Sequence, residues 1–221
     1  MQNYPQGVLV ENEINDGSFS GRIGPLCADL LTQIPDTAVV LDICSGEGGN
    51  SRQLFPKNHV YGLEYSIEHC VRGKAAGSLQ ICGDAEVLPF ADNSVAVALF
   101  FDGIEHLSDP VKSLREVHRV LHPGALLFIT TPLMPWIGFR RLHDYGSMVP
   151  QHIRRVHLRE YSFGFPGLIQ KQGFSIIRQS SHDPLGYSML KKIYDRMPDT
   201  VRWFFGCTQL VVAQKTVIKN S

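Results

Sequence analysis

Residues 39–49 constrain the fold more than any other part of this 221-residue chain. An apolar run that reads as a buried strand leads directly into a glycine-rich turn, and a helix is expected to begin at Asn50 or Ser51. Glycines let the backbone bend sharply and approach a ligand without a Cβ in between, while the helix N-terminus offers unpaired N–H groups to an anionic group. Because this order of strand, turn and helix is typical of nucleotide-binding units, the segment predicts an α/β fold with a nucleotide-like ligand.

Further apolar runs follow with the spacing of a β-α-β chain. They cover residues 60–63, 79–82, 95–101 and 125–130, and two later runs cover 173–177 and 208–213. The clearest helix begins after Asp109-Pro110, an N-cap followed by a first-turn proline, and is expected to end at Pro123-Gly124. Helical spacing also covers about 22–33, before Pro35, and 187–205. This rhythm predicts a mostly parallel sheet in one domain over residues 1–221, with residues 1–36 as an N-terminal covering segment.

The rhythm stops after the run at 125–130, where about 28 residues precede the next readable element. Loops of that length inside a compact domain are usually functional when they are ordered. Residues 132–160 are therefore interpreted as a substrate lid inserted after the fifth strand. Residues 138–159 contain five Arg and one Asp, so an anionic acceptor is one option for this insert.

Composition excludes several classes of function. The formal charge of +0 and the pI of about 7.1 provide no basic field for nucleic acid, which becomes an unlikely partner. The five cysteines are odd in number and never form C-x-x-C, which argues against a disulfide framework or a zinc site and favours a reducing cytoplasm. No apolar run approaches the roughly 18 to 20 residues of a membrane-spanning helix, and no secretion signal is recognised.

A nicotinamide dinucleotide is one alternative ligand for the glycine turn. Its fingerprint, G-x-G-x-x-G, would require glycine at the position of Ser51, and the acid Asp42 just before the turn is also unlike that fingerprint. A nicotinamide-dependent oxidoreductase is therefore kept only as an alternative.

Four segments in order give the chain a more specific resemblance. Residues 39–49 resemble motif I of the class I S-adenosylmethionine-dependent methyltransferases, especially the small-molecule type 11 branch. Residues 60–64 resemble that family's second strand, and residues 82–90 its third motif. Residues 95–107 and 116–125 resemble its fourth strand and the following helix. The resemblance covers about residues 38–131 and implies a doubly wound, mostly parallel, seven-stranded Rossmann-like sheet with an antiparallel last strand.

The resemblance also implies a cofactor, S-adenosylmethionine, released as S-adenosylhomocysteine, and the residues that hold it. Glu64 would accept both ribose hydroxyls, Asp84 would accept from the adenine amino group, and the Ala85 backbone N–H would meet the ring. The expected cofactor-binding residues are Arg22, Asp42, Cys44, Ser45, Gly46, Gly48, Glu64, Tyr65, Asp84, Ala85 and Phe100. The family usually has glycine at the position of Cys44, often cysteine at Ser45 and often aspartate near Ala96, so the methionine end of the pocket is where this chain departs most.

The acceptor is less well defined than the cofactor. His106, Tyr145, His152 and His157 are candidates for a general base, which an oxygen acceptor would normally need and a nitrogen or sulfur acceptor need not. We expect methylation of an O, N or C atom of a small molecule without a metal, by a monomer or homodimer. Nucleobases are disfavoured because the Asn/Asp-Pro-Pro-Tyr and Pro-Cys motifs are missing after the fourth strand. A non-catalytic relative that keeps the cofactor only for stability is the second alternative.

Overall fold

A computed structural model describes residues 27–132, 161, 164–182, 196, 198 and 208–217. Its strands are β1 (Val39–Ile43), β2 (His59–Glu64), β3 (Leu79–Cys82), β4 (Val95–Phe101), β5 (Leu121–Pro132), β6 (Phe174–His182) and β7 (Thr208–Lys215). Its helices are α2 (Gly49–Leu54), α3 (Ile67–Ala75), the short 3-10 helix η1 (Ile104–His106), α4 (Pro110–Val120) and α7 (Phe165–Gln170), and residues 27–31 are also helical. No helix among these residues is long and apolar enough to cross a membrane.

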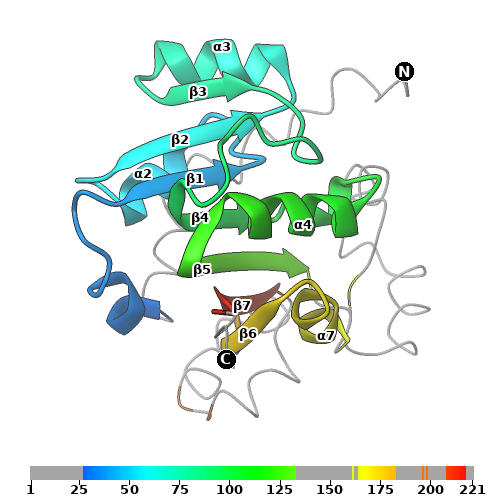
Figure 1. Ribbon diagram of the computed structural model, residues 1–221. Coiled ribbons are helices and arrows are strands. Elements are labelled where there is room, and N and C mark those ends of the chain that lie inside the picture. The colour runs from blue at the N-terminus through cyan, green and yellow to red at the C-terminus, as the bar shows by residue number, and fades with distance from the viewer. Residues whose placement is uncertain are drawn as a thin grey trace.

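The strands form one seven-stranded sheet in the order β3-β2-β1-β4-β5-β7-β6 (Figure 1). The pairs β3·β2, β2·β1, β1·β4 and β4·β5 are parallel, whereas β7 runs antiparallel to both β5 and β6. Parallel neighbours require crossover connections, and helices such as α3 and α4 provide them. The expected doubly wound, mostly parallel sheet with an antiparallel last strand is confirmed.

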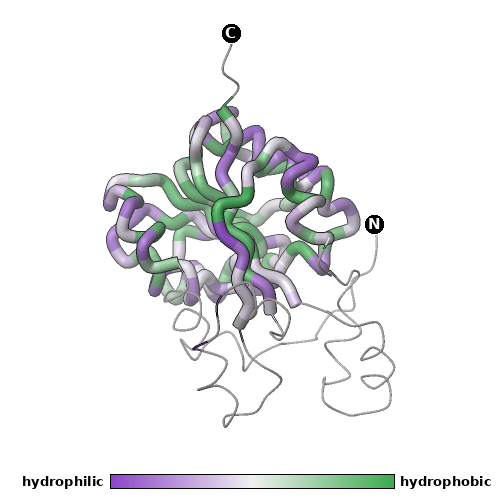
Figure 2. The backbone as a smooth tube through the Cα atoms, turned by 90° about the horizontal axis from the view of Figure 1, so that it is seen from below, coloured by the Kyte–Doolittle hydropathy of each residue, from purple (hydrophilic) through white to green (hydrophobic). Residues whose placement is uncertain are grey.

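Apolar side chains fill both faces of the sheet. On one face α4 and α7 pack over β1, β4, β5 and β7, and on the other the segment 27–34 and the end of α2 pack against the alternate residues of the same strands. The hydrophobic stretches accordingly run through the middle of the molecule, and hydrophilic residues are frequent along its outer segments (Figure 2). Because the central strands are covered on both sides, their sequences read as continuous apolar runs.

Helix α4 begins where the sequence predicts, because the Asp109 side chain accepts a hydrogen bond from the Lys112 N–H at 3.0 Å and Pro110 occupies the first turn. The predicted end at Pro123-Gly124 was wrong. Leu121 is extended, fully buried and paired with Val95, so the chain enters β5 directly after Val120. Leu121 therefore belongs to the sheet and not to the apolar stripe of the helix.

Three other parts of the sequence interpretation lie mostly outside the described residues. The predicted helix over 22–33 is seen only as residues 27–31, and the proposed lid 132–160 is represented only by Pro132, the last residue of β5. The segment with helical spacing at 187–205 is described only at residues 196 and 198. The covering segment and the lid therefore stay predictions.

Candidate cofactor and acceptor site

The turn after β1 has an unusual backbone. Cys44, Gly46 and Gly48 all adopt positive φ, at 59°, 54° and 77°. Glycine takes this conformation without steric cost, whereas for cysteine it is strained by about 1 kcal/mol. The alternating left-handed residues fold the chain tightly between β1 and α2, as the glycine pattern predicts.

Glu64, the last residue of β2, holds this turn from the side. Its Oε2 accepts a hydrogen bond from the Gly46 N–H at 3.0 Å, and its Oε1 accepts one from the Ser66 N–H at 2.9 Å. The Ser45 N–H also donates to the Leu63 carbonyl at 3.1 Å. The carboxylate is thus fixed against the glycine turn, and its remaining lone pairs suit a ligand with two neighbouring hydroxyls.

Asp42 lies beneath the same turn and is only 4% exposed. Burial is the main cause that raises the pKa of its carboxyl group to about 7; a hydrogen bond with Ser51 opposes the shift, and the negative charge of Glu64 adds to it. Asp42 is therefore almost completely buried within β1, and it supports the turn from there. Tyr65, by contrast, is 65% exposed beside Glu64.

The segment after β3 carries the residues expected to meet adenine. Asp84 is exposed, and its Oδ1 accepts a hydrogen bond from the Glu86 N–H at 2.8 Å, which closes a local turn. Ala85 is buried, and the Gly83 N–H donates to the Glu64 carbonyl at 3.0 Å. A backbone hydrogen bond therefore links the segment of Asp84, the candidate for adenine, to Glu64, the candidate for ribose.

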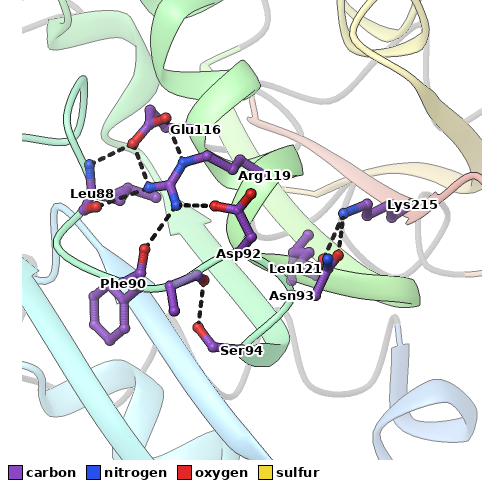
Figure 3. A network of polar contacts seen from close by, with 10 residues as sticks. Leu88, Phe90, Asp92, Asn93, Ser94, Glu116, Arg119, Leu121 and Lys215 are labelled. Carbon is purple, nitrogen blue, oxygen red and sulfur yellow. Dashed lines mark hydrogen bonds and ion pairs between the residues drawn. The ribbon is translucent and has the colours of Figure 1, made fainter.

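Arg119 of α4 fixes the rest of this segment (Figure 3). Its guanidinium donates to the Leu88 carbonyl at 3.0 Å, the Phe90 carbonyl at 2.8 Å and Asp92 Oδ1 at 2.7 Å. Two more bonds, each of 2.8 Å, join it to Glu116, whose Oε2 also accepts from the Leu88 N–H at 2.9 Å. These contacts lower the pKa of Glu116 and raise that of Arg119. We call this set of contacts the Arg119 clamp. No role was assigned to it from the sequence, although Glu116 and Arg119 carry opposite charges three residues apart on one helix, which is a signal for such a pair.

The connection after β4 is fastened to the end of β5 by two threonines. Thr130 Oγ1 donates to Asp102 Oδ1 at 2.9 Å, and Thr131 Oγ1 donates to Glu105 Oε2 at 3.1 Å. Glu105 is only 1% exposed, so burial, together with the charge of Asp102, raises the pKa of its carboxyl group well above the usual range. These contacts position His106, the half-buried candidate base that follows Glu105 in η1.

A row of buried polar side chains continues from this point across the sheet. In the strand register Thr131 faces Gln209, and Gln209 faces Ser181, so all three side chains lie on one face. All three are fully buried. Within the described part of the chain, neither amide atom of Gln209 nor Oε1 of Glu105 has a hydrogen-bond partner. This row was not singled out from the sequence, because Gln209 lies within the run predicted at 208–213, which reads as an ordinary strand.

The remaining candidates differ in how they can act. Phe100 is fully buried in the core, which leaves its backbone as the part able to face a ligand. Arg22, Tyr145, His152 and His157 lie outside the described residues. The other candidates lie at or just after the carboxyl ends of β1, β2, β3 and β4. The strands β1 and β4 are parallel neighbours, and the order in which successive strands are added to the sheet reverses between them (Figure 1). Ligands of open α/β sheets bind at such a switch point.

Comparison with known proteins agrees with this geometry. A family model described as a methyltransferase domain matches residues 41–129. A demethylmenaquinone methyltransferase of Listeria monocytogenes is 29% identical over 180 residues, which cover 69% of this chain and 76% of that protein. The chain is an S-adenosylmethionine-dependent methyltransferase. Its matched residues 41–129 contain the motifs that resemble the class I enzymes of the type 11 branch.

Two further comparisons have a narrower reach. A malonyl-[acyl-carrier protein] O-methyltransferase of Coxiella burnetii is 32% identical to the methyltransferase over 139 residues, which cover 62% of this chain and 42% of that protein. The crystal structure of an S-adenosylmethionine-dependent methyltransferase from Methanosarcina mazei matches with a TM-score of 0.64 and 17% identity, covering 86% of this chain and 97% of that one. That structural likeness concerns the fold alone. Together the matches favour methylation of a small molecule over the oxidoreductase and the non-catalytic alternatives.

Proposed function

We propose that this methyltransferase holds the adenosine part of S-adenosylmethionine between Glu64 and Asp84 and the methionine part over residues 44–48. The observation that carries the proposal is the pair of hydrogen bonds that fix the Glu64 carboxylate against the Gly46 N–H and the Ser66 N–H. A carboxylate fixed in this way is preorganised to accept from a ribose diol. The exposed Asp84, tied to β2 through Gly83, supplies the second acceptor group.

When bound, the cofactor supplies an electrophilic methyl group on a sulfonium. The protein then has to hold the acceptor in line with the methyl group and shield both from water. The connection that begins at Asp102 and contains His106 lies at the end of β4, next to the end of β1. We place the acceptor over the ends of β4 and β5, where His106 is the described candidate that could take a proton.

For the acceptor we propose a small molecule that is methylated at an oxygen atom or on a quinone-like ring. Two relatives support this class, because one is a demethylmenaquinone methyltransferase and the other is a malonyl-[acyl-carrier protein] O-methyltransferase. An anionic acceptor remains a prediction that depends on the arginines of residues 138–159. A cytoplasmic location also remains a prediction, supported by the odd number of cysteines and the lack of a C-x-x-C pattern in the sequence.

Calorimetric titration with S-adenosylhomocysteine tests the cofactor site. Glu64→Ala and Asp84→Ala should each weaken binding by about 1 to 3 kcal/mol, since each removes an acceptor of charged or polar donors. Glu64→Gln retains an acceptor oxygen and should fall between Glu64→Ala and the natural protein. Glu68→Ala is the control, because that side chain is 71% exposed on α3. Unchanged affinity in both alanine variants would overturn the assignment.

Turnover is tested separately with labelled S-adenosylmethionine and two acceptor sets, naphthoquinols and malonyl thioesters. Transfer of label to either set identifies the acceptor class. Tight binding of S-adenosylhomocysteine without transfer to any acceptor would favour the non-catalytic alternative. Binding of a nicotinamide dinucleotide without binding of S-adenosylhomocysteine would favour the oxidoreductase.

A further inference from the structure

Gln80 is a buried polar side chain in the short strand β3, only 5% exposed. Its amide makes two hydrogen bonds to the glycine turn. Ser45 Oγ donates to Gln80 Oε1 at 3.1 Å, and Gln80 Nε2 donates to the Gly46 carbonyl at 3.3 Å. A buried amide is retained at low cost only where both its donor and its acceptor are matched, and here both partners belong to the turn.

Three glycines surround this amide and leave room for it. A Cβ at Gly62 would lie 2.7 Å from Gln80 Oε1, one at Gly73 would lie 2.9 Å from Gln80 Cγ, and one at Gly48 would lie 3.0 Å from Gln80 Nε2. Gly62 and Gly73 belong to β2 and α3, where glycine costs about 0.5 to 1 kcal/mol relative to alanine. Of the three, Gly48 alone has a positive φ, so close packing on Gln80 is the reason for glycine at the other two positions.

A second side chain, from the residue just before β3, binds the next carbonyl of the turn. Ser78, just before the strand and two residues before Gln80, donates from its Oγ to the Glu47 carbonyl at 2.7 Å. Consecutive carbonyls of the turn are therefore bound from the β3 side, while the Gly46 N–H is bound by Glu64 from β2. Gly46 is therefore held by hydrogen bonds at both its N–H and its carbonyl.

We infer that Gln80 is a positioning residue for the methyl-donor turn, which it holds through Ser45 and Gly46. The inference rests on the proposed function, since it takes this turn as the seat of the methionine part of the cofactor. Among glutamine, glutamate and leucine, which have similar size, only glutamine can accept from Ser45 and donate to the Gly46 carbonyl at the same time with an uncharged side chain of fixed donor and acceptor atoms. A leucine at position 80 leaves both groups unmatched, and a glutamate cannot donate to the carbonyl when it is ionised.

Two ligands that differ only at the amino-acid end provide the test. S-adenosylhomocysteine carries the amino-acid part, whereas 5′-methylthioadenosine keeps the ribose and adenine and lacks it. In Gln80→Leu we expect the affinity for S-adenosylhomocysteine to fall about tenfold and that for methylthioadenosine to change less than about twofold. Ser45→Ala, which removes one of the two bonds, should give a smaller loss of about threefold with the same selectivity and serves if Gln80→Leu does not fold.

Ile81→Ala is the matched control, because Ile81 is the next residue of β3 and packs on the apolar core instead of the turn. It should lower the free energy of unfolding while leaving both affinities in place. Unchanged binding of S-adenosylhomocysteine in both Gln80→Leu and Ser45→Ala, or a parallel loss of both ligands, would overturn the positioning role. Failure of the natural protein to bind either ligand would instead overturn the proposed function and, with it, this inference.

Discussion

Replacing Arg119 by leucine removes the clamp that joins α4 to the segment after β3. The guanidinium makes five hydrogen bonds, of which two go to backbone carbonyls and three to carboxylate oxygens of Glu116 and Asp92. Its side chain is 31% exposed and that of Asp92 is 69% exposed, so solvent screens the bond to Asp92 strongly. The loss therefore comes mainly from the Leu88 and Phe90 carbonyls and from Glu116, which keeps its charge without its partner.

We expect Arg119→Leu to lower the free energy of unfolding by about 2 to 3 kcal/mol, counting about 1 kcal/mol for each of these three partners. For a chain of this size that corresponds to a fall in Tm of roughly 5 to 10 °C. Urea denaturation monitored by circular dichroism measures the change. Because the clamped segment carries Asp84 and Ala85, affinity for S-adenosylhomocysteine should fall as well.

Arg115→Leu is the matched control on the same helix. Arg115 makes one exposed hydrogen bond, to Gln172 Oε1 at 3.2 Å, so its loss should cost no more than about 0.5 kcal/mol. If Arg119→Leu were no more destabilising than Arg115→Leu, the clamp would have no measurable energy and the reasoning would be refuted.

Three further predictions concern the turn and the polar row. In the folded protein the pKa of Asp42 is about 7, above its ordinary value of 3.8, so the stability that its protonated form contributes is complete below pH 3.8 and is lost as the pH rises to 7. In urea unfolding, Asp42→Asn should therefore gain stability relative to the natural protein as the pH rises over that range, and a pH-independent difference would contradict this. Gln209→Met should raise the Tm, since it removes an unmatched buried amide worth about 1 to 3 kcal/mol, and a lower Tm would show that the amide is matched in solution. Gly48→Ala should destabilise by about 2 kcal/mol in denaturant, because φ is +77° and the new Cβ would lie 2.8 Å from Ser78 Oγ, whereas Gly49→Ala, with nothing within 4 Å, should be neutral.

The sequence was most informative where the sheet is covered on both faces. The runs predicted at 39–43 and 95–101 coincide with β1 and β4, because both faces of these central strands are covered and most of their residues are therefore apolar. The run at 79–82 also coincides with β3, although β3 is an edge strand with exposed residues. The edge strand β6 was only half foreseen. Its second half contains Arg178, Ser180 and Ser181, and Arg178 forms an ion pair with Asp29 from the helical segment 27–31. Such a strand carries no apolar run, so only the fold reveals it.

The backbone conformation of the proposed cofactor turn was predictable from the sequence, whereas the side chains that support this turn were not. A glycine turn, an acid at the end of β2 and an acid after β3 are local signals that the sequence displays in order. Gln80 and Arg119 act on residues 34 and 31 positions away, across elements whose proximity appears only after folding. A polar residue in a short apolar strand, or an arginine on a helix, has several ordinary explanations until its partners are known. Burial and hydrogen-bond partners therefore identify these residues, whereas residue type alone does not.

Cys44 provides a further contact between segments that are far apart in the sequence. The family pattern favours glycine there, and the positive φ of Cys44 retains the backbone that glycine would adopt. The extra side chain is accommodated on the opposite strand connection, since a Cβ at Gly103 would lie 2.6 Å from Cys44 Cβ and 3.2 Å from its Sγ. The turn after β1 thus has the larger residue, Cys44, and the connection after β4 has glycine, Gly103, at the position that packs against it. Burial and the surrounding carboxylates raise the pKa of the Cys44 thiol, so a neutral sulfur occupies the space between these two strand ends. Cys44 and Gly103 follow β1 and β4, the two strands of the switch point. Because a cysteine side chain is larger than glycine, we expect Cys44 to narrow the proposed site at its methionine end.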